Sequence, residues 1–565
     1  MKASFSRVKL IFTMLTVFAF SSFAGGDSLA EKVDKLFSEW DKLASPGCAL
    51  GIIKDGHLVY ARGYGLANLE YNIPLSSKSV FRIGSTSKQF TAMCMILLEE
   101  KGKISLDDNI RKYLPEIREY ESPITIRHLL HHTSGLRDYL ELMYLAGMRD
   151  DDFLTDGEVL DLIARQKELN FKPGDEYLYS NSGYFLLSVI VKRASGQSLR
   201  KFAEENIFKP LGMKVTHFHD DHTMFVKNRA AGYSPQKKDG FRINMTTLDV
   251  VGDGGIFTTV EDLCVWDQNF YHNKLGKGGQ DLIKKMLTPA TLNNGERLDY
   301  ACGLVVSEYR GLKMVSHGGA FVGFRAEMIR FPEQKFSVIC LANLSSIAPT
   351  KLALQVADIY LSGQFKKGKE KAVVSGAKFI ELPEKELKSK TGTFKNLKTG
   401  SIAEISIQEG KLMVNASGYT FQISPVSSTR FRAVEAPVDI ELEFERKEKD
   451  KPQVMRAYME SQKPETYEAI EVISPSPAQL AEYRGKYYSE ELLAGYKIVF
   501  EEEKLFLRHE NRYKNYPQTP LKPTVKDEFH VEGININFIR DNKGKISAFL
   551  MESGRVKHIR FEKKS

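Results

Sequence analysis

The chain has 565 residues, which is long enough for two to four domains and at least one large hydrophobic core. Hydrophobic residues make up 42% of it and charged residues 27%, a composition typical of globular proteins. The formal net charge of +8 is spread along the chain without a basic stripe that alternates with aromatic residues, so the sequence argues against nucleic-acid binding.

The N-terminus has the pattern of a secretory signal peptide. Three cations, Lys2, Arg7 and Lys9, precede an apolar run at 10–20 that is short for a membrane span. Small residues follow at Ser22-Phe-Ala24, so we expect cleavage near Ala24 and a periplasmic or secreted protein. An uncleaved membrane anchor is the alternative, and no later stretch of the sequence is a transmembrane candidate.

Residues 28–365 are predicted to form one domain of helices and short strands. The predicted helices are residues 29–43, 90–98, 157–166, 183–194 and 349–361. The predicted strands are a hairpin at 48–60, which turns at Asp55-Gly56, and runs at 312–316, 324–331 and 336–341. Strands at both ends with helices between them predict one sheet in which the first and last strands meet, with a helical insert beside it.

Beyond residue 370, polar and apolar residues alternate, with turn signals about every ten positions, as in antiparallel β-structure. This part contains an internal repeat, because four anchors recur in the same order at nearly the same offset. They are Leu387–Phe394 with Leu480–Tyr487, Lys411–Leu412 with Lys504–Leu505, Pro425 and Phe431 with Pro523 and Phe529, and Met459–Ser461 with Met551–Ser553. We therefore predict a linker at 366–380 and two small β-barrel modules, at 381–473 and 477–565, joined by the stiff segment Ser474–Pro477.

The five cysteines are scattered through apolar segments and show no C-x-x-C spacing; they are Cys48, Cys94, Cys264, Cys302 and Cys340. This pattern favours buried free thiols over a disulfide framework or a zinc site. A single disulfide remains open for a protein outside the cytoplasm.

Ser85 and Lys88 form an S-x-x-K motif at the start of a predicted buried helix. A serine hydroxyl is a weak nucleophile until a base removes its proton, and a lysine one helical turn later lies on the same face. At a helix N-terminus, backbone N–H groups also favour developing negative charge. Taken alone, the motif is more often an N-cap serine followed by a solvated lysine.

Tyr179 and Asn181, which follow Pro173-Gly174, are candidates for a second acid or base near the leaving group. A tyrosine with a pKa of about 10 is a poor base unless nearby cations depress that pKa, and we expect Lys88 to do so. The alternative reading is a core aromatic residue and a helix N-cap.

The segment Ser316–Ala320 carries a His-Gly-Gly sequence between two predicted strands. The glycines let a substrate approach the strand backbone closely, so that a backbone N–H at the strand edge can complete an oxyanion hole. His317 would point into the same cleft. By itself, such a segment is more often a turn with a surface histidine.

Together and in this order, the three elements resemble the serine β-lactamase and penicillin-binding-protein superfamily, especially its class C-like branch of esterases, D-aminopeptidases and D-peptidases. The stretches at 124–136 and 254–259 strengthen the resemblance, which covers roughly residues 30–365. It implies an α+β fold with an antiparallel sheet flanked by helices and a helical subdomain, followed in this chain by two small lipocalin-like antiparallel β-barrels. It implies no cofactor and no catalytic metal.

Carried over to this chain, the resemblance implies that Ser85 is the acylated nucleophile and that Lys88 and Tyr179 share its proton. Tyr179 then protonates the leaving group and activates water for deacylation. Asn181 orients Lys88 and the substrate amide.

The resemblance places the oxyanion hole at the backbone N–H groups of Ser85 and Ala320, with Gly318 and Gly319 in the same substrate-binding segment. Where β-lactamases carry a lysine that meets the substrate carboxylate, this chain has His317. A neutral histidine is a weaker anchor for a carboxylate near pH 7. This departure argues against efficient β-lactam hydrolysis and D-Ala-D-Ala carboxypeptidation, and favours D-amino-acid amides, D-peptides or simple esters.

We therefore expect a secreted serine hydrolase with D-aminopeptidase-like or D-peptidase-like activity on a small-molecule or peptide substrate, including one derived from the cell wall. D-aminopeptidases of this superfamily share the layout of a catalytic domain followed by two barrels, and in them a loop from the last barrel reaches the active site. The alternatives are a carboxylesterase, a weak β-lactamase or penicillin-binding protein, and a catalytically silent wall-binding or sensor protein.

A competing metal signal lies in the string Thr216–His222, where the pattern H-x-H-x-D-H of metallo-β-lactamases occurs at His217, His219, Asp221 and His222. That fold needs a βαβ setting before the string and further ligands after it, and the sequence offers neither. We predict a structural or surface role for these residues, with an incidental divalent-cation site as the alternative.

Overall fold

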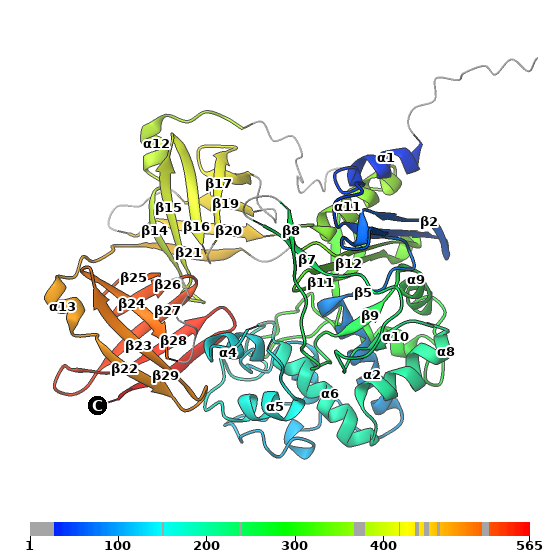
Figure 1. Ribbon diagram of the computed structural model, residues 1–565, viewed down its shortest axis with the longest axis horizontal. Coiled ribbons are helices and arrows are strands. Elements are labelled where there is room, and N and C mark those ends of the chain that lie inside the picture. Colours follow the sequence, from blue (N-terminus) through cyan, green and yellow to red (C-terminus); the bar gives the residue numbers. More distant parts are fainter. Residues whose placement is uncertain are drawn as a thin grey trace, which may run out of the picture.

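The computed structural model describes residues 28–564, except for gaps at 150–151, 237–239, 367–378, 417–418, 435–439, 446–450, 460–463 and 511–518 (Figure 1). The predicted signal peptide at residues 1–24 and most of the predicted linker at 366–380 lie outside the described residues. Within the described part of the chain, no helix is long and apolar enough to span a membrane.

A six-stranded antiparallel sheet forms the centre of the first domain, with the strand order β10-β11-β12-β13-β1-β2. Its strands are β1 (Cys48–Lys54), β2 (His57–Tyr64), β10 (Val305–Tyr309), β11 (Leu312–Phe321), β12 (Phe324–Phe331) and β13 (Phe336–Ala342). The predicted meeting of the first and last strands is confirmed, since β1 pairs with β13 along its whole length. The hairpin of β1 and β2 turns at Asp55 and Gly56, which both have positive φ, as predicted from the Asp-Gly pair.

Helices cover both faces of this sheet, which explains why β1 is apolar and buried from Cys48 to Ile53. On one face, α1 (Leu29–Phe37) and α11 (Pro349–Leu361) pack in one core with Leu50 and Ile52. On the other face, α2 (Lys88–Glu100) and α9 (Val260–Asn269) share a second core with Ala49 and Ile53. Successive strand residues point to opposite faces, so a strand with helices on both sides buries the side chains on both of its faces.

The helical insert lies to one side of the sheet and is built around α6 (Asn181–Ser195), which is buried from Asn181 to Val191 (Figure 1). The other helices are α3 (Ile126–Leu130), α4 (Tyr139–Leu145), α5 (Asp156–Ala164), α7 (Leu199–Ala203), α8 (Lys209–Leu211) and α10 (Asp281–Met286). Short helical turns occur at η1 (Gly84–Ser87), η2 (Ile110–Lys112), η3 (Glu204–Phe208) and η4 (Pro332–Gln334). Short strands are β3 (Leu66–Asn68), β4 (Ile73–Pro74), β5 (Phe81–Arg82), β6 (His217–Phe218), β7 (Tyr233–Pro235), β8 (Phe241–Ile243) and β9 (Ile256–Thr258).

Two predicted elements differ most from those observed. The first helix ends at Phe37, six residues before the predicted end, and the side chain of Leu43 is 87% exposed, so the apolar periodicity beyond Phe37 does not mark a buried face. Strand β11 continues to Phe321 where the sequence predicted an end at 316, because His317–Phe321 keeps pairing with β12. The five cysteines are all free, and Cys264 alone among them is half-buried rather than buried.

Two closed antiparallel barrels follow, as predicted from the repeat. The first contains β14 (Gly392–Asn396), β15 (Ile402–Gln408), β16 (Lys411–Ala416), β17 (Tyr419–Pro425), β18 (Arg430–Val434), β19 (Ile440–Phe444), β20 (Val454–Met459) and β21 (Glu465–Ile470). The second contains β22 (Gly485–Ser489), β23 (Ala494–Glu501), β24 (Lys504–His509), β25 (Pro520–Pro523), β26 (Glu528–Val531), β27 (Ile534–Arg540), β28 (Ile546–Ser553) and β29 (Val556–Lys564). A short helix precedes each barrel, α12 (Glu384–Lys388) and α13 (Pro477–Ala481).

The repeated anchors occupy equivalent places in the two barrels. Pro425 pairs with Phe431 in the first barrel, and Pro523 pairs with Phe529 in the second. Both phenylalanines are buried in the barrel interior. The repeat therefore reflects one strand register that is used twice, and this register is fixed by which side chains must point inward.

Candidate active site

Ser85 lies directly before the buried helix predicted from the apolar run that follows it. The turn η1 leads into α2, whose first residue is Lys88. The two side chains therefore meet one turn apart, with Lys88 Nζ 3.1 Å from Ser85 Oγ. The backbone N–H groups of this first turn have no partners within the helix, so they stabilise negative charge that develops beside them.

Lys88 is fully buried, and three oxygens surround its amine. Besides Ser85 Oγ, they are Asn181 Oδ1 at 2.8 Å and the backbone carbonyl oxygen of Asp253 at 2.6 Å. An ammonium group has three N–H donors, so this cage satisfies each of them. The lysine is thus held in a single position beside the serine hydroxyl.

Burial lowers the pKa of Lys88 to about 7, because the charged amine has lost its water. The carboxylates of Asp253 and Asp138 oppose this shift, and the nearby guanidinium of Arg555 adds to it. A large fraction of Lys88 is therefore uncharged near neutral pH. An uncharged lysine at 3.1 Å can accept the proton of Ser85.

Tyr179 lies beside this pair, but its pKa shifts in the direction opposite to the one expected. Burial raises the pKa of Tyr179 well above its ordinary value, and the nearby Ser85 hydroxyl offsets only part of this rise. The expected depression by Lys88 is absent, because the loss of water around the buried phenol outweighs the interactions that would lower its pKa. The Tyr179 hydroxyl is buried without a hydrogen-bond partner among the described residues, so it is a phenol that can donate a proton to an incoming group.

Asn181 is the first residue of α6 and joins the lysine to the helical insert. Its side-chain oxygen accepts from Lys88, and its backbone N–H donates to Asp138 Oδ2 at 2.7 Å. The residue before it, Ser180, makes no side-chain cap of the helix. Asn181 therefore acts through its amide on Lys88 and is not an ordinary N-cap.

His317 is buried in β11 and both of its ring nitrogens are engaged. Nδ1 lies 2.6 Å from the carbonyl oxygen of Gly318, which can only accept, so Nδ1 carries the proton. Nε2 lies 3.0 Å from the hydroxyl of Tyr300 and accepts from it. Burial, together with the charge of Lys88, lowers the pKa of His317 to about 4, so this histidine is neutral at pH 7 and offers no cation to a substrate carboxylate.

The edge of β11 meets the turn η1, which contains Ser85, at two glycines. A Cβ atom at Gly319 would lie 1.9 Å from the carbonyl oxygen of Ile83, which no side chain tolerates. A Cβ at Gly84, which has φ +50, would lie 2.9 Å from the backbone nitrogen of Ala320. These glycines therefore bring the backbone N–H of Ala320 close to that of Ser85, as a two-donor oxyanion hole requires.

Sequence reasoning did not single out four further residues that surround the site. They are His132, Asp138, Asp253 and Tyr300. The His132 ring stacks on Tyr179 with 4.1 Å between ring centroids, and its Nδ1 accepts from the backbone N–H of Ser180. Asp138 caps α4 and Asp253 supplies a carbonyl to Lys88. The stretches 124–136 and 254–259 gave the nearest signal, since they contain or adjoin His132 and Asp253. Nothing in the sequence pointed to Tyr300.

The hairpin between β28 and β29 of the second barrel also reaches this site. Arg555 Nη1 lies 3.2 Å from Asp138 Oδ2, and its Nε lies 3.2 Å from Glu141 Oε1. The guanidinium carbon is 5.6 Å from the centre of the Tyr179 ring. Because Asp138 also accepts from the backbone N–H of Asn181, and Asn181 Oδ1 accepts from Lys88, a chain of three hydrogen bonds connects Arg555 of the second barrel to Lys88.

The residues of the H-x-H-x-D-H string do not form one cluster. The rings of His217 and His219 lie against each other, with 3.4 Å between Nε2 and Nδ1. Asp221, His222 and Asp249 form a separate group whose possible ligand atoms lie within 4.8 Å of one another, and His222 Nδ1 there contacts Asp249 at 2.9 Å. Among the described residues, the string therefore divides between two places, and neither includes Ser85 or Lys88.

Comparison with protein families matches residues 33–358 to the beta-lactamase family. The chain is 30% identical to a penicillin-binding protein of Bacillus subtilis (strain 168) over 407 residues, which are 68% of this chain and 88% of that protein. It is 29% identical to a D-aminopeptidase of Gluconobacter oxydans (strain 621H) over 307 residues, which are 54% of this chain and 57% of that protein.

Among solved structures, the octameric penicillin-binding protein homologue from Pyrococcus abyssi is similar in fold, with a TM-score of 0.56 and 26% sequence identity. The match covers 78% of this chain and 99% of that chain, so it extends beyond the residues matched by the family.

Proposed function

The chain belongs to the beta-lactamase family and is a serine hydrolase of the β-lactamase and penicillin-binding-protein superfamily, and from this we propose that it cleaves amide bonds of D-residue compounds through an acyl-enzyme on Ser85. The observation that carries the proposal is the buried Lys88 amine, which lies 3.1 Å from Ser85 Oγ and has a pKa of about 7.

In the first step, uncharged Lys88 accepts the proton of Ser85 as Oγ bonds to the substrate carbonyl carbon. The carbonyl oxygen becomes an oxyanion, which the backbone N–H groups of Ser85 and Ala320 stabilise. The Tyr179 phenol protonates the leaving amine as the C–N bond breaks, and the Lys88 ammonium returns a proton to Tyr179. This division of roles follows from the two pKa directions, because Lys88 is the better base and Tyr179 the group that keeps its proton.

In the second step, a water molecule attacks the ester carbonyl of the acyl-enzyme. Uncharged Lys88 takes the water proton, directly or through Tyr179, and passes a proton to Ser85 Oγ as the ester bond breaks. Serine and lysine are then as they began. No cofactor takes part in either step.

Two observations favour D-residue amides over β-lactams as substrates. Relatives that match this chain include D-aminopeptidases, such as that of Gluconobacter oxydans. His317 is neutral and engaged by Tyr300 and Gly318, so it gives the carboxylate of a β-lactam no positive charge to bind.

The test is a panel of matched D- and L-aminoacyl p-nitroanilides, nitrophenyl esters and nitrocefin, run with the wild-type chain and with Ser85→Ala. We expect cleavage of D-aminoacyl amides above their L-enantiomers, and a loss of at least about 10⁴-fold in kcat for Ser85→Ala. Cleavage of L-aminoacyl substrates alone would overturn the D preference. Full activity of Ser85→Ala, with loss of activity in EDTA, would overturn the serine mechanism itself.

The proposed location is outside the cytoplasm, and it rests on the sequence of residues 1–24 alone. Expression of the full chain followed by N-terminal sequencing of the product tests it. We expect a mature product that begins after Ala24 and appears in the periplasm or the medium. An intact N-terminus on protein that stays in the cytoplasm would contradict this expectation.

A further inference from the structure

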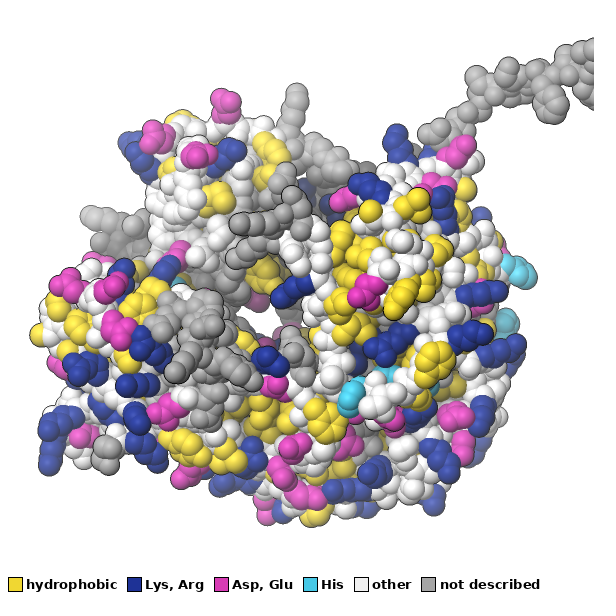
Figure 2. Space-filling model, viewed as in Figure 1, with side chains coloured by type: hydrophobic (Ala, Val, Ile, Leu, Met, Phe, Trp, Pro, Cys, Tyr) yellow, Lys and Arg dark blue, Asp and Glu magenta, His cyan; other side chains and the backbone are white. Residues whose placement is uncertain are grey.

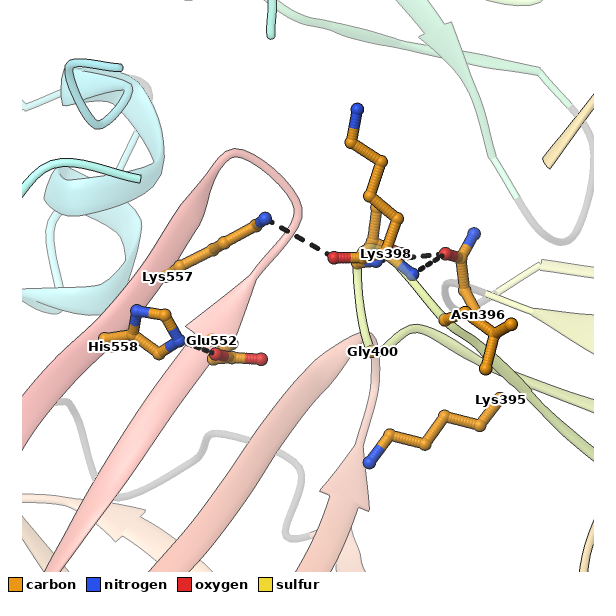
Figure 3. Close-up of a pocket in the computed structure, with 9 residues that line it drawn as sticks. Lys395, Asn396, Lys398, Gly400, Glu552, Lys557 and His558 are labelled. Atoms are coloured by element: carbon orange, nitrogen blue, oxygen red, sulfur yellow. Dashed lines mark hydrogen bonds and ion pairs between the residues drawn. The ribbon is translucent and has the colours of Figure 1, made fainter. Parts of the chain in front are cut away.

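A cavity of about 490 Å³ lies between the two barrels (Figure 3). One wall, from Lys395 to Gly400, is the end of β14 and the turn that leads to β15 in the first barrel. The opposite wall is formed by Glu552, Lys557 and His558 of β28 and β29 in the second barrel. Its volume is within the range of about 300–1,000 Å³ that is usual for small-molecule sites.

The wall from the first barrel is held in place by its own hydrogen bonds. Asn396 Oδ1 accepts from the backbone N–H groups of Lys398 and Thr399, at 2.8 and 3.0 Å. The carbonyl oxygen of Gly400 accepts from Asn535 of the second barrel at 2.9 Å. A turn fixed on both sides presents its groups in one arrangement, so a ligand loses little free energy in ordering it.

The charges that line the cavity leave one cation without an acidic partner. Lys395 is paired with Glu528 at 2.7 Å, and Glu552 is engaged by His558 at 3.1 Å. Lys557 has no carboxylate partner among the described residues. Its amine donates to the carbonyl oxygen of Lys398, on the opposite wall, at 3.4 Å (Figure 3). The amine is therefore available to a carboxylate.

Both walls of the cavity connect to the active site. Lys398 forms an ion pair with Glu176 at 2.8 Å, and Glu176 lies three residues before Tyr179. Lys557 lies two residues after Arg555, on the order of 7 Å along a strand, and Arg555 faces the Tyr179 ring. Figure 2 shows an opening between the barrels and the catalytic domain, with lysine or arginine side chains at its rim.

We propose that this cavity is a distal subsite that binds the acidic end of an extended peptide substrate, whose carboxylates contact Lys557 while its scissile amide lies at Ser85. This inference rests on the proposed function for the identity of the substrate as a D-residue peptide. A polar cavity with an unpaired lysine suits a hydrophilic anion better than an apolar group, because burying an apolar group there would strip water from charges without replacing it. The subsite gives the enzyme a preference for acidic peptides that its neutral His317 cannot supply.

The test measures binding to full-length Ser85→Ala, so that no probe is cleaved. The probes are fluorescein-labelled peptides of four D-alanines that carry either two D-glutamates or two D-glutamines at one end, made for each end. We expect one acidic peptide to bind about tenfold more tightly than its neutral partner at low salt, with the difference shrinking as salt is added. Adding Lys557→Gln removes that difference, and Lys557→Glu reverses it. Lys545→Gln changes an exposed lysine that lies immediately before the other end of β28, and it leaves the difference in place.

Equal affinity for acidic and neutral peptides, or a preference that survives Lys557→Gln, would overturn the subsite. Cleavage of the neutral peptide by the wild-type chain separates this failure from a failure of the proposed function. If the neutral peptide is cleaved and no acidic preference exists, the subsite is wrong and the hydrolase assignment stands. If the acidic peptide binds through Lys557 and neither peptide is cleaved, the subsite stands and the proposed reaction is wrong.

Discussion

The two barrels share a strand register and a set of repeated anchors, yet they meet the catalytic domain differently. The core of the second barrel is continuous with that of the catalytic domain, whereas the core of the first barrel is separate. The second barrel lies against α4 (Figure 1), where Tyr496 donates to the carbonyl oxygen of Leu145 at 2.8 Å. The repeat predicts the shape of both barrels, while loop side chains that differ between the copies decide which one docks.

The interfaces of the two barrels with the catalytic domain differ most in how deeply their charged side chains are buried. Arg137 of the catalytic domain pairs with Glu491 of the second barrel at 2.7 Å, and their side chains are 0% and 5% exposed. The ion pair between the first barrel and the catalytic domain joins Lys398 to Glu176, and its lysine side chain is 63% exposed. The interface of the second barrel therefore keeps at least one ion pair away from water, whereas the ion pair that joins the first barrel is exposed.

The largest expected effect comes from Arg137→Met, which leaves Glu491 buried without its partner. Breaking a buried pair from one side costs about 3–5 kcal/mol of the free energy of unfolding. Urea unfolding followed by near-ultraviolet circular dichroism measures this loss. The double variant Arg137→Met/Glu491→Gln should recover part of the stability, and a single variant as stable as wild type would refute the docking account.

Arg555→Gln tests whether the second barrel positions the catalytic groups. Loss of the guanidinium frees Asp138, which holds the backbone of Asn181, so we expect kcat to fall by about 10–100-fold with a smaller change in KM. Arg560→Gln is the matched control, because Arg560 lies on β29, the strand that follows Arg555, with its side chain 47% exposed. A kcat equal for both variants would make Arg555 a structural residue only.

The pH dependence of kcat/KM gives a second test of whether Arg555 acts on Lys88. Lys88 must be uncharged to accept the proton of Ser85, so kcat/KM should rise with pH through about 7 and then level off. Arg555 helps to lower the pKa of Lys88, so Arg555→Gln should move this rise to higher pH, while Arg560→Gln should not. Steady-state rates between pH 5 and 9 measure both curves. A rise that moved to lower pH would contradict the sign of this interaction.

The smallest effect is expected at the exposed contact of the first barrel. Lys398→Gln removes the ion pair with Glu176 and should change the free energy of unfolding by less than about 1 kcal/mol, because exposed pairs contribute little. The same urea experiment measures it. A loss as large as that of Arg137→Met would show that the two interfaces are alike after all.

Sequence reasoning found the residues whose motifs are short and local. Ser85 and Lys88 meet because they lie one helical turn apart, and β11 brings the segment Gly318–Ala320 alongside them. Tyr300 and Arg555 were missed because long-range packing alone brings them to the site.

The predicted direction of the pKa shift of Tyr179 was wrong, because a sequence motif does not show how deeply its residues are buried. The sequence placed a cation near the phenol, and that expectation required Lys88 to stay charged. Burial instead raises the pKa of Tyr179 and lowers that of Lys88. The fold class and the paired barrels were predictable because periodic alternation and repetition are properties of the chain itself.

The central claim is that Ser85 becomes acylated, and intact-protein mass spectrometry tests it most directly. Wild-type protein incubated with a fluorophosphonate probe should gain one adduct, and peptide mapping should place it on Ser85. Ser85→Ala should gain none, and prior incubation with a D-aminoacyl amide substrate should slow labelling of the wild type. An adduct on another residue, or none on Ser85 in protein that hydrolyses its substrate, would contradict the account.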